Sequence, residues 1–185
     1  MNDWLQKGLN MVKVVTTRFC WEQELFDVFK KNNIKQIPYL PDAGHSKIIE
    51  MVHNDELFKP IVLTTEEEGV AVVCGAWLGG DRSILLMQSS GVGNCINMLS
   101  LVSNCSFPFV TIITMRGEFG EFNSWQVPMS SAVRGTLELM GVQVHRVEKT
   151  EDVAPTVDAA LYSAYSSNQR IAVLLSQKLI GRKEW

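Results

Sequence analysis

Apolar and polar positions along the chain follow two different periods, and the alternation between them predicts the order of the elements. Short apolar runs bounded by proline, glycine or polar residues predict buried strands, whereas apolar residues spaced three and four apart predict helices. The runs that predict strands cover residues 34–40, 61–63, 84–87, 109–115, 142–147 and 171–175. Helical spacing falls before and between them, over residues 21–29, 48–52, 70–77, 96–102, 137–140 and 153–165, and the first helix is expected to follow Thr17.

Strands that are separated by helix-length segments predict a parallel sheet with helices on both faces. We therefore expect an α/β fold of three layers, α/β/α, around a parallel six-stranded sheet. A chain of 185 residues suits one domain of ordinary size. No repeat, low-complexity tract or interdomain linker interrupts the pattern, so residues 1–185 are expected to form a single domain.

Charge and composition narrow the partners that the chain could bind. The formal net charge is −3, from 20 acidic and 17 basic residues without a basic cluster, which argues against a nucleic acid or a membrane surface. Neither a leader-like N-terminus nor an apolar run long enough to span a bilayer occurs. The four cysteines form no C-x-x-C pair and favour buried free thiols, so we expect a reducing compartment and a cytoplasmic protein.

Ligands of parallel α/β sheets bind beyond the carboxyl ends of the strands, so the loops that follow strands are the candidates for a site. Four loops qualify: residues 41–45, 64–68, 89–94 and 116–128. The last of them is long and polar, which is typical of functional loops.

The segment Thr65-Glu66-Glu67-Glu68 has the T-x-x-E spacing of a capping box. Capping, together with the favourable position of carboxylates at a helix N-terminus, explains Glu67 and Glu68. Glu66 differs because it begins the helix directly after a buried strand, at the edge where ligands bind, and small residues follow it in the next turns. Small side chains there allow another group to pack closely.

Two glycines stand where the segment Ser89-Ser90-Gly91-Val92-Gly93-Asn94 opens a helix, a pattern suited to close backbone approach and to hydrogen bonding by exposed amides. Ile96 occupies the third glycine position of a dinucleotide fingerprint, and no acidic residue follows at the ribose-binding distance. A Rossmann cofactor, a flavodoxin-like flavin or nucleotide site, and an ordinary nucleoside triphosphate loop are therefore disfavoured.

Arg116 opens the long polar loop and has the geometry to hold an anionic substrate group. The alternative is an ion pair with Glu118 or Glu121 that orders the loop, and the sequence does not choose between the two. No metal site is expected in the chain. The histidines lack metal-ligand spacing and favour structural or surface positions over catalysis: His45, His53 and His145.

Several segments, taken in order, resemble the pyrimidine-binding domain of thiamin diphosphate-dependent 2-oxoacid decarboxylases: Thr65-Glu66-Glu67-Glu68-Gly69-Val70-Ala71, Gly75-Ala76-Trp77 and Leu86-Met87-Gln88-Ser89-Ser90-Gly91-Val92-Gly93-Asn94. The likeness is closest to the sulfopyruvate and phosphonopyruvate decarboxylases. The segment from Arg116 to Pro128, RGEFGEFNSWQVP, resembles the family of sulfopyruvate decarboxylase α-subunits in particular. The resemblance extends from about Thr17 to Leu175.

The resemblance implies that Glu66 is the activating acid of the cofactor, because it lies nine positions before Gly75 as in that family. In the family this carboxyl group hydrogen-bonds N1′ of the aminopyrimidine ring. A pocket shielded from water suits the task because burial favours the protonated carboxyl group. By the same analogy, the segment after the third strand lines the pyrimidine pocket through Gln88, Ser90, Gly91, Val92, Gly93 and Asn94.

The second half of the family's site has no counterpart in the chain. That half is a diphosphate-binding domain with a G-D-G motif and a later asparagine, and the one near match, Gly80-Asp81-Arg82, is typical of a turn that ends a helix. The resemblance therefore implies that the chain carries half of an active site. A β-subunit would supply the ligands of Mg²⁺ and of the diphosphate, and the enzyme would be active only as a hetero-oligomer.

The loop Pro41-Asp42-Ala43-Gly44-His45 aligns with the loop that supplies a substrate-facing polar residue in related decarboxylases. Ala43 stands where some relatives have serine or aspartate. Asp42 and His45 are therefore the candidates for handling protons during the reaction.

The activity that the resemblance implies is that of a lyase acting on a three-carbon 2-oxoacid with an anionic tail, which would convert 3-sulfopyruvate to sulfoacetaldehyde and CO2, as in coenzyme M biosynthesis. Arg116, aided by Gln126, is the candidate for binding the sulfonate. The alternatives are a phosphonopyruvate decarboxylase, another 2-oxoacid decarboxylase or carboligase split into two chains, and a catalytically silent α/β binding or regulatory subunit.

Overall fold

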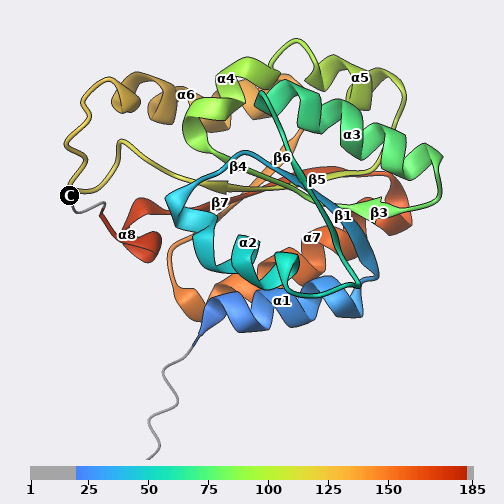
Figure 1. Cartoon of the computed structure of the whole chain (residues 1–185). Helices are drawn as coiled ribbons and strands as arrows, with labels where there is room; N and C mark the ends of the chain where they lie inside the picture. Colours follow the sequence, from blue (N-terminus) through green and yellow to red (C-terminus); the bar gives the residue numbers. More distant parts are fainter. Residues whose placement is uncertain (1–19, 183–185) are drawn as a thin grey trace, which may run out of the picture.

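A computed structural model describes residues 20–182, which form three layers with a sheet in the middle (Figure 1). The expected start of the first helix at Thr17 lies outside these residues. The helices are α1 Trp21–Lys31, α2 Ser46–His53, α3 Glu66–Leu78, α4 Val92–Cys95, α5 Leu99–Asn104, α6 Gln126–Leu139, α7 Val153–Ser167 and α8 Gln177–Ile180. The strands are β1 Ile34–Tyr39, β2 Lys59–Val62, β3 Arg82–Ser83, β4 Leu85–Gln88, β5 Phe109–Thr114, β6 Gln143–Val147 and β7 Arg170–Leu175.

The sheet has the order β2-β1-β4-β5-β7-β6, and its neighbouring strands all pair in parallel. This confirms the predicted parallel α/β fold. The sequence pattern missed β3, which lies off this path and pairs with β1. Its two residues, Arg82 and Ser83, are polar and so fall outside any apolar run, and the Tyr165 hydroxyl holds the strand by donating to the Ser83 carbonyl at 2.7 Å.

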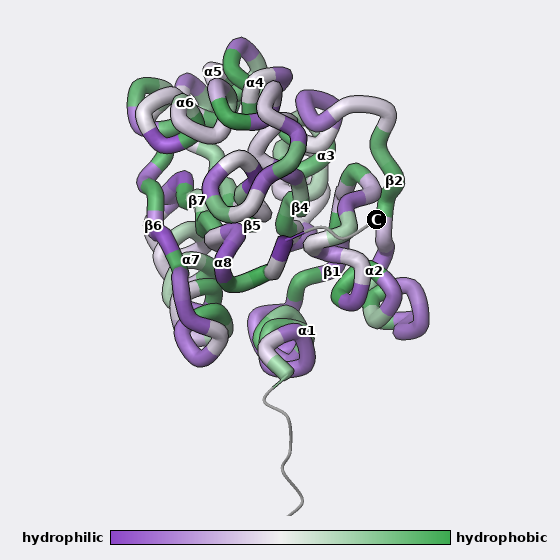
Figure 2. Tube along the Cα trace, turned by 90° about the vertical axis from the view of Figure 1, so that its left-hand side faces the viewer, coloured by the Kyte–Doolittle hydropathy of each residue, from purple (hydrophilic) through white to green (hydrophobic). Residues whose placement is uncertain are grey.

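Two apolar cores fill the spaces above and below the sheet. In β5, Val110 and Ile112 pack with the buried side chains of α1, α2 and α7, whereas Phe109 and Ile113 pack with those of α3 to α6. Such alternation leaves a central parallel strand buried on both faces, and every residue of β5 is buried. In Figure 2, α1 is seen end-on beneath the sheet, with hydrophilic positions on its outer side.

The helix predicted over residues 96–102 is wrong in one respect, because residues 96–98 form a turn between α4 and α5 and the helix begins at Leu99. Leu99 and Val102 are fully buried, as their spacing predicts, but Ile96 is 39% exposed and does not share their apolar face. Gly93 and Asn94 have low helix propensity, which is consistent with so short an α4.

The four cysteines are free thiols in different environments. Cys74 and Cys95 are buried as expected, and burial raises the pKa of Cys74 to about 11 and that of Cys95 to about 12. Cys20 is half-buried and Cys105 is exposed, so the expectation of buried thiols is wrong for Cys105. Within residues 20–182, no helix has both the length and the apolar character that crossing a membrane would require.

Candidate active site

The carboxyl ends of neighbouring strands bring the candidate loops together at one edge of the sheet. β1, β4 and β5 are adjacent, so the loops that follow them, residues 41–45, 89–94 and 116–128, lie side by side. β2 lies next to β1 and leads into residues 64–68. A fifth segment, which the sequence pattern did not single out, follows β7 and contains α8.

Glu66 is the first residue of α3, and its side chain faces a pocket between the ends of β1 and β4. The residue is only 5% exposed, and the side-chain amide of Asn94 donates to its Oε2 at 2.8 Å. No other hydrogen bond reaches this carboxylate from residues 20–182. The pocket has a volume of about 120 Å³, and its lining residues are Leu40, Pro41, Asp42, Glu66, Gln88 and Ser90.

Gly91 lies against the Glu66 carboxylate. A Cβ atom at this position would lie 2.4 Å from the carboxyl carbon of Glu66, well inside van der Waals contact. The backbone of Gly91 is in the ordinary helical region, with φ of −70°. Glycine is therefore needed here for space rather than for an unusual backbone conformation.

The capping box predicted at the start of α3 forms only in part. Oε2 of Glu68 accepts hydrogen bonds from the backbone N–H of Thr64 at 2.8 Å and from its hydroxyl at 3.0 Å, and these bonds lower the pKa of Glu68. The hydroxyl of Thr65, the N-cap residue, makes no capping hydrogen bond, so the predicted reciprocal contact is wrong. Glu68 thus stabilises the start of the helix, Glu67 is exposed, and Glu66 alone faces the pocket.

Asp42 lies beside this pocket with its carboxylate enclosed by hydrogen-bond donors. The Thr114 hydroxyl donates to Oδ2 at 2.6 Å, and the Gln88 amide donates to Oδ1 at 3.0 Å. Burial alone would raise the pKa of this carboxyl group, but the contacts with His45, Thr114 and Gln88 outweigh it and hold the pKa well below its usual range. Asp42 is therefore a carboxylate at neutral pH.

His45 is fully buried beneath Asp42, with its Nδ1 at 3.4 Å from Oδ2 of Asp42. Neither ring nitrogen makes a hydrogen bond within the described part of the chain. The contact with Asp42 is thus too poorly aligned to be a hydrogen bond. A buried imidazole without hydrogen bonds is uncommon, because its desolvation is not compensated.

Gln88 connects the pocket of Glu66 with the long polar loop. Its Oε1 accepts from the Ser90 hydroxyl at 2.9 Å and from the Gln126 side-chain amide at 3.2 Å. Gln126 is 6% exposed, and its own Oε1 has no hydrogen-bond partner among residues 20–182. Residues 42, 88, 90 and 126, all expected at the site, are therefore joined in one network.

Arg116 makes the ion pair that was one of its two expected roles. Its Nε and Nη2 donate to the two carboxylate oxygens of Glu121 at 2.7 and 2.8 Å, and the residue is only 7% exposed. Its Nη1 has no hydrogen-bond partner among the described residues. Ion pairing with Glu121 therefore orders the loop and leaves one guanidinium nitrogen available.

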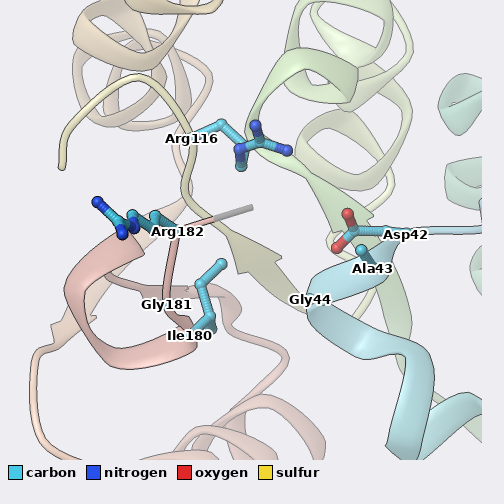
Figure 3. Close-up of a pocket in the computed structure, with 7 residues that line it drawn as sticks. All are labelled: Asp42, Ala43, Gly44, Arg116, Ile180, Gly181 and Arg182. Carbon is cyan, nitrogen blue, oxygen red and sulfur yellow. The ribbon is translucent and has the colours of Figure 1, made fainter. Parts of the chain in front are cut away.

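Arg116 also lines a second pocket, with a volume of about 170 Å³, next to the first. Figure 3 shows Asp42 and Arg182 on opposite sides of it, with Arg116 above and Ile180, from the end of α8, below. The complete lining is Asp42, Ala43, Gly44, Arg116, Ile180, Gly181 and Arg182. Asp42 is common to both pockets.

Two expected pocket residues lie elsewhere, and two residues of the site were not expected. Val92 is fully buried in the apolar core, and Gly93 packs toward Met129, so neither lines the pocket of Glu66. Thr114 and Gln177 were missed. Thr114 could have been found as a polar residue at the carboxyl end of an otherwise apolar strand, whereas nothing in the sequence around Gln177 distinguishes it.

No group of three or more histidine, cysteine, aspartate or glutamate side chains in residues 20–182 is arranged to hold a metal ion. The polar groups at this edge of the sheet instead suit an organic ligand with a hydrogen-bonding ring: a buried carboxylate, amide side chains and apolar walls.

Comparison with solved structures supports the fold. A putative thiamin diphosphate-dependent enzyme from Mycobacterium smegmatis matches 84% of this chain with a TM-score of 0.66 and 17% identity. The benzoylformate decarboxylase of Polynucleobacter necessarius matches 89% with a TM-score of 0.65 and 15% identity. The chain spans only 30% and 31% of these two solved chains. The fold is thus that of one domain of thiamin diphosphate-dependent enzymes.

Sequence relatives narrow this class. The sulfopyruvate decarboxylase subunit alpha of Methanothermobacter thermautotrophicus is 33% identical over 74% of this chain and 83% of its own length, and that of Methanococcus maripaludis is 29% identical over 83% and 92%. The chain belongs to the family of sulfopyruvate decarboxylase α-subunits. No protein-family model matches it.

Two other relatives are longer. The sulfopyruvate decarboxylase of Methanosarcina acetivorans is 30% identical over 85% of this chain, which corresponds to 40% of that protein. A phosphonopyruvate decarboxylase of Streptomyces viridochromogenes is 35% identical over 65% of this chain and 31% of its own length. More than half of each of these proteins therefore has no counterpart here.

Proposed function

We propose that this chain is the α-subunit of a thiamin diphosphate-dependent decarboxylase that converts 3-sulfopyruvate to sulfoacetaldehyde and CO2. One observation carries the proposal: in a member of this family, a nearly buried glutamate faces a pocket at the carboxyl edge of the sheet, with a glycine pressed against its carboxylate.

The residues around Glu66 fit an aminopyrimidine ring. Such a ring has apolar faces and polar edges, and the pocket offers the apolar side chains of Leu40 and Pro41 beside the carboxylate and the amide of Gln88. Asn94 orients one carboxylate oxygen of Glu66, which leaves the other for a ring nitrogen. When bound, thiamin diphosphate would supply the nucleophilic carbon and the electron sink that decarboxylation of a 2-oxoacid requires. Glu66 would hold the proton at the ring nitrogen.

Asp42 and His45 are our candidates for the proton that decarboxylation consumes. Loss of CO2 from a 2-oxoacid leaves a carbon that must take up one proton to give the aldehyde. Asp42 borders both pockets and is held as a carboxylate, while the imidazole of His45 lies 3.4 Å behind it. A proton taken from solvent would reach that carbon through Asp42, which would bind it and release it again, with the imidazole of His45 in contact with the carboxylate.

Arg116 is our candidate for the anionic tail of the substrate, with Gln126 beside it in the network. Glu121 holds the plane of the guanidinium, and Nη1 remains available to a sulfonate oxygen. Glu121 also offsets the charge of Arg116, so binding would depend on directed hydrogen bonds more than on net charge. Phosphonopyruvate, which carries a similar tail, is the alternative substrate.

A partner subunit would complete the site. The chain corresponds to 40% of a longer relative, and residues 20–182 contain no group of three or more histidine, cysteine, aspartate or glutamate side chains arranged for a metal ion. We therefore assign the ligands of Mg²⁺ and of the diphosphate to a β-subunit. The free cysteines favour a reducing compartment, and we propose that the enzyme is cytoplasmic.

The test is reconstitution with a second chain that carries a G-D-G motif and a later asparagine. Release of CO2 from 3-sulfopyruvate, phosphonopyruvate and pyruvate would be measured with thiamin diphosphate and Mg²⁺ present, with this chain alone as the control. We expect activity from the pair only, and highest with 3-sulfopyruvate.

Glu66→Gln should lower kcat of the pair by at least about 100-fold, since it removes an acid–base group. Glu67→Gln is the matched control, because Glu67 is adjacent in sequence but exposed. Full activity of the Glu66→Gln pair would favour a catalytically silent role for this chain.

A further inference from the structure

The loop between β5 and α6 is held by buried ionic contacts. Glu121 is at their centre, with a side chain only 3% exposed. The Glu121 carboxylate accepts hydrogen bonds from the Arg116 guanidinium, as described above. It also accepts from the backbone N–H groups of Gly117 and Asn123 and from the side-chain amide of Gln177. These contacts, with that of Arg116 the largest, lower the pKa of Glu121 to about 2. The loop therefore has a charged interior.

Contacts with two other elements fasten the same loop to the domain. Gln177, fully buried in α8, accepts hydrogen bonds from the backbone N–H groups of Glu118 and Phe119, both at 2.8 Å. Arg146 in β6 binds both carboxylate oxygens of Glu118, at 2.6 and 2.9 Å. Gly117 turns the backbone with φ of +75°, a region that favours glycine. The loop thus has one fixed shape.

The large apolar side chains of this loop are exposed, whereas the side chains of Arg116 and Glu121 are buried. We call three residues of the loop, Phe119, Phe122 and Trp125, together with Val127 of the first turn of α6, the aromatic surface; their exposed fractions are 52%, 49%, 68% and 41%. The other large exposed apolar residues among those described, such as Leu78, Leu139 and Tyr162, lie apart on other elements. A loop that exposes several aromatic residues close together in sequence is typical of a binding surface.

The aromatic surface adjoins the rim of the candidate active site. The loop begins at Arg116, which lines the pocket shared with Asp42, and it ends at Gln126, which donates to Gln88. In Figure 1 the loop precedes α6 on the same side of the molecule as α8. A protein bound to this surface would therefore lie over the entrance to both pockets.

We propose that the aromatic surface docks the partner subunit that completes the active site. This inference rests on the proposed function. Relatives that match 83% and 74% of this chain are called subunit alpha, and a longer relative has more than half its length beyond the matched part. A separate chain that replaces that part must bind where it reaches the pocket rim, and preorganised aromatic side chains lower the entropic cost of such binding.

Other occupants fit the surface less well. A second copy of this chain would add no group of metal ligands from residues 20–182. A membrane would favour unpaired basic residues around the aromatic side chains, but Arg116 and Arg146 are paired with Glu121 and Glu118.

The experiment measures the dissociation constant of the full chain with a second chain that carries the G-D-G motif and a later asparagine, with thiamin diphosphate and Mg²⁺ present. Phe119→Ser with Trp125→Ser should weaken association at least about 10-fold, the loss of one strong contact residue. The matched control is Leu139→Ser with Tyr162→Ser, which removes two apolar side chains that are 89% and 72% exposed on other elements. The control should leave the dissociation constant unchanged within about twofold.

Three results would overturn the inference. The first is equal affinity of the Phe119→Ser/Trp125→Ser variant and the Leu139→Ser/Tyr162→Ser control for the second chain. The others are that the Phe119→Ser/Trp125→Ser variant, but not the control, loses self-association or loses binding to phosphatidylglycerol vesicles. Failure of the unmodified chain to bind any such second chain would also overturn it. Binding and CO2 release are measured separately. A pair that forms through this surface but decarboxylates no 2-oxoacid would contradict the proposed function and leave the docking surface supported.

Discussion

The Cα of Gly91 faces the Glu66 carboxylate so closely that a methyl group there would lie 2.4 Å from the carboxyl carbon. We expect Gly91→Ala to displace Glu66 from the pocket and to lower both cofactor affinity and kcat of the reconstituted pair by at least about 10-fold. Gly75→Ala is the control, because a Cβ at Gly75 has no heavy atom within 4 Å. In the interior of α3 this control should stabilise the protein by about 0.5–1 kcal/mol. An unchanged affinity in Gly91→Ala would show that Glu66 does not bind the cofactor.

Thr114→Val should shift the acid side of the pH profile of kcat/KM toward higher pH. The Thr114 hydroxyl helps to hold the pKa of Asp42 low, so removing its 2.6 Å hydrogen bond raises that pKa, and the carboxylate is then lost at a higher pH. Thr111→Val is the control, since the Thr111 hydroxyl is equally buried in β5 but donates to the Leu85 carbonyl. If both variants keep the profile of the unmodified protein, Asp42 is not the group that titrates in the reaction.

Acid should lower the stability of the folded chain because it protonates the Glu121 carboxylate. Its pKa is about 2 in the folded protein against an ordinary 4.5, so its stabilising contribution is complete above about pH 4.5 and is lost as the pH falls toward 2. The midpoint of urea unfolding should therefore fall over this interval. In Glu121→Gln the decline should be shallower, whereas Glu67→Gln, which changes an exposed carboxylate, should follow the unmodified chain.

The role of Arg116 is best tested in a variant that also neutralises Glu121. Removing the guanidinium alone would leave the Glu121 carboxylate buried without its ion pair. Arg116→Ala combined with Glu121→Gln should raise KM for 3-sulfopyruvate by about 10- to 100-fold, the loss of a charge-assisted hydrogen bond. Glu121→Gln alone should change KM much less, since it keeps the guanidinium. A KM unaffected in the double variant would rule out Arg116 as the sulfonate ligand.

Much of the fold follows from the apolar pattern, because a central parallel strand must be apolar on both faces. β5 is the clearest case, and its six residues are all buried. The apolar pattern gave wrong predictions for segments whose structure does not depend on apolar runs. Arg82 and Ser83 form a strand through backbone pairing and the Tyr165 hydroxyl, and Ile96 lies in a turn that interrupts its helix.

The position of the candidate site could be predicted from the sequence, but most of the hydrogen bonds and ion pairs between its residues could not. Strand ends identify the loops, and the resemblance identifies Glu66. The choice between two roles for Arg116 needed distances, because an arginine five residues before a glutamate can either bind it or turn away. Gln177 lies 56 residues beyond Glu121 in sequence, and only the pairing of β7 with β5 brings it to the loop. Contacts made across the sheet have no signal in local sequence.

Because Asp42 borders both pockets, it is the residue that a change of substrate must leave alone. Ala43 and Ile180 line the pocket that Arg116 borders, where the tail of the proposed substrate would lie. In the proposed site, exchange of these two apolar side chains would therefore change which substrate tail fits, while Glu66 and its contacts stay as they are.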